Sequence, residues 1–209
     1  MNDSKGEAGK WLDFLLPQAA SMQPGWLQDL VNGEVDLLAR IRDSRSARAL
    51  LTRFANKRHA LKVPGRTTLA PHQQWLLLNH SRQRTLAHQL AIDALSDFVR
   101  TTVRGSAVAA LRKALGEADY GRALRGPGLP VQGLNRAQFE RALQRGALSD
   151  YLLGVGAALL ETTTQGGDPF CHLRMRFAFS PPVWASRPQG LQVDAAALAA
   201  RIETARQEA

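Results

Sequence analysis

The sequence has few of the features that mark secreted, membrane or metal-binding proteins. Its single cysteine, Cys171, excludes an internal disulfide framework and fits a reducing compartment. No run approaches the roughly 20 apolar residues that a transmembrane helix needs. Residues 1–10 are polar and lack the apolar centre of a signal peptide. We therefore expect a flexible tail at 1–10 and a cytosolic protein.

Motifs for catalysis and cofactor binding are also missing. None of the five histidines stands in an i, i+4 pair of the kind that holds a metal ion. Cys171 and His172 are adjacent, and adjacent side chains on a strand point to opposite faces, which argues against a thiol nucleophile with its base. Gly154 and Gly156 lack the third glycine of a dinucleotide site, and no Walker-type phosphate loop occurs. The sequence predicts a protein without cofactor, metal or small-molecule substrate, and not an enzyme.

Helical periodicity dominates what is present. Apolar residues recur at helical spacing from Leu86 to Val103, which predicts a long central helix that Gly105 ends. Ser106 would cap a second helix that ends at Gly116. We expect buried side chains at Leu90, Phe98 and Leu111. Two aspartates at i, i+4, Asp93 and Asp97, have basic neighbours and are interpreted as surface charge.

Two later segments complete the predicted fold. Residues 150–160 combine leucine with glycine and alanine, which favours a buried helix in close contact with another helix. Residues 170–179 alternate apolar and polar residues, which favours a short extended or strand-like segment lying across the helices, although Phe170, Leu173 and Phe177 would also suit a short helix. At 209 residues and 44% hydrophobic, the chain fits a single compact domain over 11–209. The predicted fold class is mainly α.

Positive charge is concentrated in residues 40–66. This window holds nine lysines and arginines against Asp43 alone, a balance of +8, and the net charge of the whole chain is +9. The window also has an amphipathic helical pattern, with Leu50 and Phe54 assigned to its apolar side. It is either a solvated basic face or an electrostatic docking surface. With Phe54 assigned to the core, no platform for base stacking is visible, so nucleic acid is the less favoured partner.

The order of several short segments resembles the SctK family (YscK- and PscK-like proteins) of bacterial type III secretion systems. The resemblance rests on the following segments: Pro24-Gly25-Trp26-Leu27, the helices of 86–125, the Gly/Pro loop 126–130, the helix 150–160, residues 170–177 and Pro181-Pro182-Val183-Trp184. It extends over most of the chain from about Trp26 to Ile202 and offers no catalytic residues.

The resemblance implies a cytoplasmic adaptor of the sorting platform, at the inner-membrane base of the secretion apparatus. Such proteins link the cytosolic domain of the inner-membrane ring subunit (SctD) to the pod subunit (SctQ). We expect the basic window to contribute to docking on a platform protein, with Arg45, Arg48, Arg53 and Lys57 as its members. The alternative is a basic helical protein that binds nucleic acid.

Overall fold

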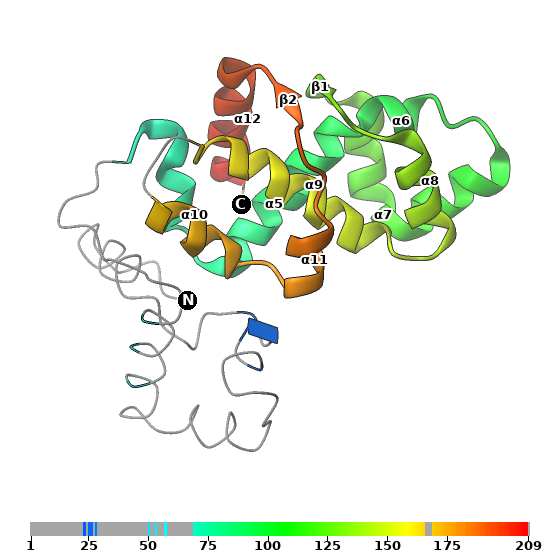
Figure 1. The fold of residues 1–209 in the computed structure, drawn as a ribbon. Coiled ribbons are helices and arrows are strands. Elements are labelled where there is room, and N and C mark those ends of the chain that lie inside the picture. Colours follow the sequence, from blue (N-terminus) through cyan, green and yellow to red (C-terminus); the bar gives the residue numbers. More distant parts are fainter. Residues whose placement is uncertain are drawn as a thin grey trace. The chain divides into compact units, whose positions relative to one another are not determined.

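A computed structural model describes residues 69–165 and 169–208, together with Gln23, Gly25, Trp26, Gln28, Leu50, Arg53 and Lys57. The fold is mainly α, as predicted (Figure 1). The elements are η2 (Pro71–Leu77), α5 (His80–Ala94), α6 (Ser96–Arg100), α7 (Gly105–Arg125), β1 (Val131–Gln132), α8 (Arg136–Gln144), α9 (Leu148–Thr162), α10 (Pro169–Arg176), α11 (Pro181–Ser186), β2 (Gln192–Val193) and α12 (Ala195–Glu208).

The chain divides into two compact units, and each is discontinuous in sequence. Unit 1 comprises residues 1–83 and 164–181, and unit 2 comprises 84–163 and 182–209. This division does not test whether the chain folds as one domain, so the single domain over 11–209 stays a prediction. The tail expected at 1–10 lies outside the described residues.

The prediction of a strand-like segment at 170–179 is wrong, because helix α10 occupies most of these residues. Pro169 stands at the first helical position, where its fixed φ favours a helix start. The buried side chains also lack the alternation of a strand, since Arg174 is 8% exposed and the adjacent Met175 is fully buried. The β-structure of the described residues is instead one antiparallel pair in unit 2, with β1 Val131 opposite β2 Val193.

The predicted central helix is shorter than expected. Leu95 separates α5 from α6, and α6 ends at Arg100. The hydroxyl groups of Thr101 and Thr102 donate to the carbonyl oxygens of Asp97 and Phe98 at 2.6 and 2.7 Å, respectively. These side-chain bonds satisfy carbonyls that the helix end leaves unpaired.

One further boundary differs from the prediction, because Gly105 is the first residue of α7 instead of ending the preceding helix. The predicted break at Gly116 is confirmed, since its φ of 76° and ψ of 164° are non-helical and α7 kinks there before it continues to Arg125. The apolar stripe was expected to continue to Val103, yet this side chain is 86% exposed because the chain has already left the helix.

The interior of unit 2 includes most of the predicted core. Leu90 and Leu111 are fully buried, as expected, whereas Phe98 is half-buried. Helix α9 is buried along most of its length, which confirms that prediction. A Cβ added at Gly156 would lie 2.0 Å from the backbone oxygen of Ala87, so α9 and α5 are in backbone contact there. Figure 1 shows these two helices side by side.

Unit 1 is built around α10 and η2, which pack against each other. Trp75 and Leu76 of η2 are buried, and so are Phe177 and Phe179, which follow α10. The buried Gln83 amide donates to the carbonyl oxygens of Leu76 and Leu78 at 3.1 and 3.0 Å. This amide fixes the chain where η2 ends.

Candidate docking surfaces

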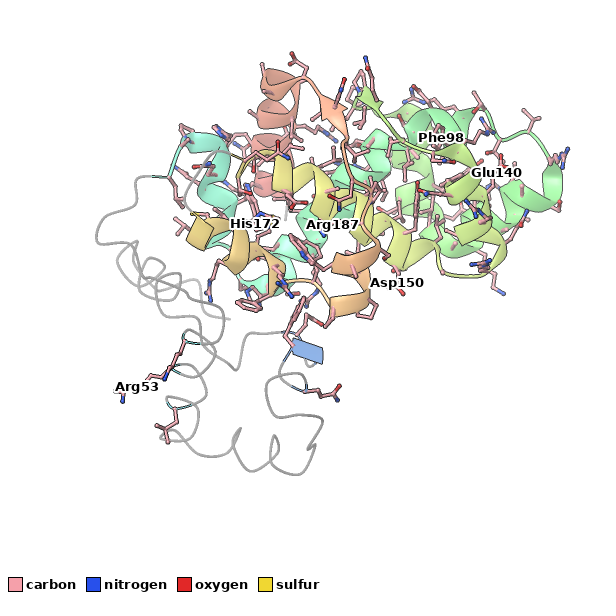
Figure 2. All side chains as sticks on the ribbon, viewed as in Figure 1. Arg53, Phe98, Glu140, Asp150, His172 and Arg187 are labelled. Carbon is pink, nitrogen blue, oxygen red and sulfur yellow. The ribbon has the colours of Figure 1, made fainter. Side chains whose placement is uncertain are left out.

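The predicted basic face is partly within the described residues. Arg53 and Lys57 are helical and exposed, whereas Arg45 and Arg48 lie outside the described residues. Figure 2 shows the Arg53 side chain extending away from the backbone. Their spacing of four residues is the one at which side chains of a helix share a face. The structure thus places two of the four predicted site residues at exposed helical positions.

We name Leu50, Arg53 and Lys57 the basic face. Leu50 is also a helical position, and its exposure corrects its assignment to the apolar side of the window. Its side chain is 64% exposed. The basic face therefore presents an aliphatic side chain among its cations.

Two segments on which the family resemblance rests meet in unit 1. The indole Nε1 of Trp26 donates to the carbonyl oxygen of Phe179 at 2.6 Å, and its ring meets the Phe177 ring edge-on at 6.0 Å between centroids. The Arg176 guanidinium stacks over the indole at 4.1 Å. Trp26 is 6% exposed, so its polar and apolar parts are both enclosed.

The residue before Trp26 has no room for a side chain. A Cβ at Gly25 would lie 2.7 Å from Cδ of Pro181. The glycine and the proline were both visible in the sequence, but nothing in their local pattern indicated that they touch. This contact is a feature that the sequence reasoning missed.

A buried ionic cluster in unit 2 corrects the interpretation of Asp93 as surface charge. Asp93 is 1% exposed, and its Oδ1 accepts from Nε of Arg122 at 3.2 Å. Its Oδ2 accepts from Nε of Arg201 at 2.5 Å. Asp97, one turn later, is exposed as predicted, with its side chain at 83%. The cluster joins α5, α7 and α12, and it satisfies a carboxylate that would be costly to bury alone.

A second enclosed ion pair links α9 to the segment after α11. Nε and Nη2 of Arg187 donate to the two carboxylate oxygens of Glu161 at 2.6 and 2.8 Å. The Arg187 guanidinium also stacks over the Trp184 ring at 3.9 Å. This bidentate geometry matches the planar fork of arginine, so the pair serves the fold of unit 2.

Aromatic rings connect α6, α8 and α9. Phe98 and Phe139 have centroids 5.7 Å apart, and Phe139 and Tyr151 are 6.4 Å apart. Arg136 covers Phe98 at 5.8 Å and pairs with Glu140 at 2.9 Å (Figure 2). Burial raises the pKa of the Tyr151 hydroxyl above 10.0, because the charged form is poorly solvated there.

A second basic region went unrecognised in the sequence. Residues 100–145 hold nine lysines and arginines against three acids, a balance of +6. Residues 1–39 hold six acids against two lysines, a balance of −4, which hides this excess in the sum for the chain. A charge balance taken over short windows would have found it. The region spans the end of α6, α7 and α8.

The described residues form no group of His, Cys, Asp or Glu that could hold a metal ion. His88 instead pairs with Asp119, with Nε2 and Oδ2 separated by 3.0 Å. Cys171 is 3% exposed and lies on a helix rather than on the expected strand. Within the described ranges, no helix has the length and apolar character needed to cross a membrane.

No family model, curated protein or solved structure matches the chain.

Proposed function

We propose that the protein is a non-enzymatic adaptor in the sorting platform of a bacterial type III secretion system. It would link the cytosolic domain of an SctD-like ring subunit to an SctQ-like pod subunit, at the cytoplasmic side of the inner membrane. Two kinds of support lead to this proposal. The first is the ordered set of segments from Pro24-Gly25-Trp26 to Pro181-Pro182-Val183-Trp184 that resembles the SctK family. The second is the exposure of the basic face, which consists of Leu50, Arg53 and Lys57.

The observation that carries the docking role is the composition of that face. Leu50 is 64% exposed, and Arg53 and Lys57 are exposed as well. A face that served only solubility would gain nothing from an exposed leucine, because contact with water disfavours apolar area. A docking face uses both groups, since cations steer an acidic partner and an aliphatic side chain gains from burial on contact.

The test is a variant with Arg45, Arg48, Arg53 and Lys57 all changed to glutamate. We expect a folded protein that binds at least one purified ring or pod subunit about 10-fold more weakly, mainly through slower association. The effect should shrink as salt screens the charges. Binding is measured by surface plasmon resonance at several salt concentrations, and folding by circular dichroism.

A smaller pair of variants supplies the control. Arg53→Glu/Lys57→Glu alters the basic face, and Lys113→Glu/Arg145→Glu makes the same charge change at exposed positions of α7 and the end of α8. Only the first should weaken subunit binding. Wild-type affinity of the quadruple variant for both subunits would remove this face from the interface. Loss of DNA binding with subunit binding intact would favour the nucleic-acid alternative.

A further inference from the structure

Two short stretches of unit 1 make the contact around Trp26. On one side are Gln23, Gly25 and Trp26, and on the other are residues 176–181. The backbone N–H of Gln23 donates to the carbonyl oxygen of Phe177 at 3.2 Å, two residues before the carbonyl that accepts from the indole. A contact between two linear segments has the form of a peptide bound to its receptor.

The stretch that carries the tryptophan is held by one large anchor. Trp26 is 6% exposed, whereas Gln23 and Gly25 are half-buried and Gln28 is exposed. The backbone N–H of Trp26 also donates to the carbonyl oxygen of Gln23 at 3.0 Å, so part of the geometry of this stretch is local. A few anchoring residues, with tryptophan prominent among them, dominate the affinity of many protein interfaces.

Residues 176–181 recognise features that belong to a glycine followed by a tryptophan. The carbonyl oxygen of Phe179 accepts from the indole N–H at 2.6 Å, a donor that phenylalanine and leucine lack. The Arg176 guanidinium covers the indole at 4.1 Å, and tryptophan is the ring that favours such a contact most. Pro181 lies where a side chain at Gly25 would have to be, since a Cβ there would be 2.7 Å from its Cδ.

We propose that residues 176–181 are a recognition site for a Gly-Trp segment, which a chain fills with its own residues 23–26 or with those of a second copy. Because 153 positions separate Trp26 from Phe179, no local chain geometry requires that both belong to one molecule. Exchange of an identical segment between copies preserves every contact and links the copies. This inference does not rest on the proposed function.

Protein concentration then decides which segment fills the site. In dilute solution the chain's own segment is favoured, because binding within one molecule is not opposed by dilution. Copies that are concentrated or held together in an assembly favour exchange, since the segment of a neighbour then competes on similar terms. The contact around Trp26 would therefore close a single chain or join two chains, depending on how many copies are near.

The first experiment tests whether the site accepts the segment from outside the chain. The probe is a fluorescently labelled peptide with the sequence of residues 21–28, Ser-Met-Gln-Pro-Gly-Trp-Leu-Gln. Its receivers are the full-length wild type and the full-length variants Trp26→Ala and Trp26→Phe. Both variants should bind the peptide about 10-fold more tightly than the wild type, because their own segment competes less well for the site. Fluorescence anisotropy measures the Kd values.

Two altered peptides supply the controls. A peptide with Trp26→Ala lacks the anchor, and a peptide with Gly25→Val keeps the indole but cannot fit beside Pro181. Each should bind the variants about 10-fold more weakly than the natural sequence. Should Trp26→Ala fold poorly, the natural peptide should raise its Tm, because a ligand of the folded state stabilises it. Equal affinity of the three peptides, or no binding to either variant, would overturn the proposal.

The second experiment tests exchange between copies. Sedimentation velocity over a wide range of protein concentrations should show dimers of the wild type that increase with concentration, and monomers of Trp26→Ala. Arg176→Glu keeps Trp26 but places an acid over the electron-rich face of the indole, so it should also be monomeric. A mixture of the two variants combines an intact segment with an intact site and should form a mixed dimer. Circular dichroism checks folding, and folded variants that remain monomeric in the mixture would refute exchange.

Discussion

Unit 2 places its arginines in two opposite settings. Around Asp93, the side chains of Arg122 and Arg201 are 20% and 15% exposed and converge on one buried carboxylate. At the two ends of α7, Arg104 and Arg125 are exposed and pair with no carboxylate among the described residues. The same residue type therefore holds helices together in one region and faces solvent in the other.

The difference shows why net charge is a poor guide to function here. The Asp93 cluster contributes a net positive charge to the chain, yet its arginines are committed to the fold. Removing one residue of such a cluster is strongly destabilising, because it leaves a buried charge without its partner. The exposed arginines can change with little cost to folding, so they are free to serve a partner. Substitutions at each region can test this division.

The largest effect is expected from Asp93→Ala. Removing the carboxylate leaves Arg122 and Arg201 partly buried without their shared partner, which should cost about 3–5 kcal/mol in the free energy of unfolding. Urea unfolding followed by circular dichroism measures this loss. Asp97→Ala is the matched control, since its side chain is 83% exposed and should change stability by less than about 0.5 kcal/mol. Equal losses in the two variants would abolish the contrast between the regions.

The next effect is expected where α9 packs against α5, the helix that carries Asp93. Gly156→Ala should cost about 1–3 kcal/mol, because its Cβ would lie 2.0 Å from the Ala87 oxygen and would push α9 away from α5. Gly105→Ala, at the exposed start of α7, meets nothing within 4 Å and should raise stability by about 0.4–1 kcal/mol. Thermal melting of the two variants compares them directly. A Gly156→Ala variant as stable as the wild type would mean that α9 and α5 can separate at this contact without loss of stability.

Local patterns were sufficient to predict the helices but not the contacts that the helices make with distant residues. The stripe through Leu90 and the glycine-rich run of α9 were predictable because helical period and small residues act within a few residues. The burial of Asp93 was not, because Arg201 lies 108 positions along the chain. The contact of Trp26 with Phe179 spans 153 positions. Contacts at such separations depend on the tertiary fold and leave no local pattern.

Residues 170–179 were misassigned for a related reason. Alternation predicts a strand only if the polar residues face solvent, and Arg174 is nearly as enclosed as Met175. Of the candidate site, composition located the basic window and hence Arg53 and Lys57. It could not show that Leu50 and Val103 are exposed, because exposure of a single apolar side chain depends on where each helix ends or turns. A charge balance taken over short windows would have revealed the second basic region at residues 100–145.

A smaller effect is expected at Tyr151 of α9. Its hydroxyl is buried without a hydrogen-bond partner among the described residues, so Tyr151→Phe should raise stability by up to about 1 kcal/mol at neutral pH. The raised pKa adds a pH dependence. Above about pH 10 the unfolded chain loses this proton before the folded protein does, so wild-type stability falls as pH rises. Unfolding at pH 8 and pH 11 should show a smaller fall in the variant, and identical falls would contradict burial of the hydroxyl.

The smallest effect is the most telling for the exposed region. Arg104→Ser should raise stability by about 0.5 kcal/mol, because serine can cap the N–H groups at the start of α7 and the unfavourable cation is removed. Arg125→Ala should instead leave stability unchanged or slightly lower, since a cation at the C-terminal end of α7 favours the dipole. Both are measured by urea unfolding at low salt. A gain from Arg104→Ser would show that the helix does not require the exposed arginine that precedes it. A loss of stability would place Arg104 with Arg201 among the arginines that the fold requires.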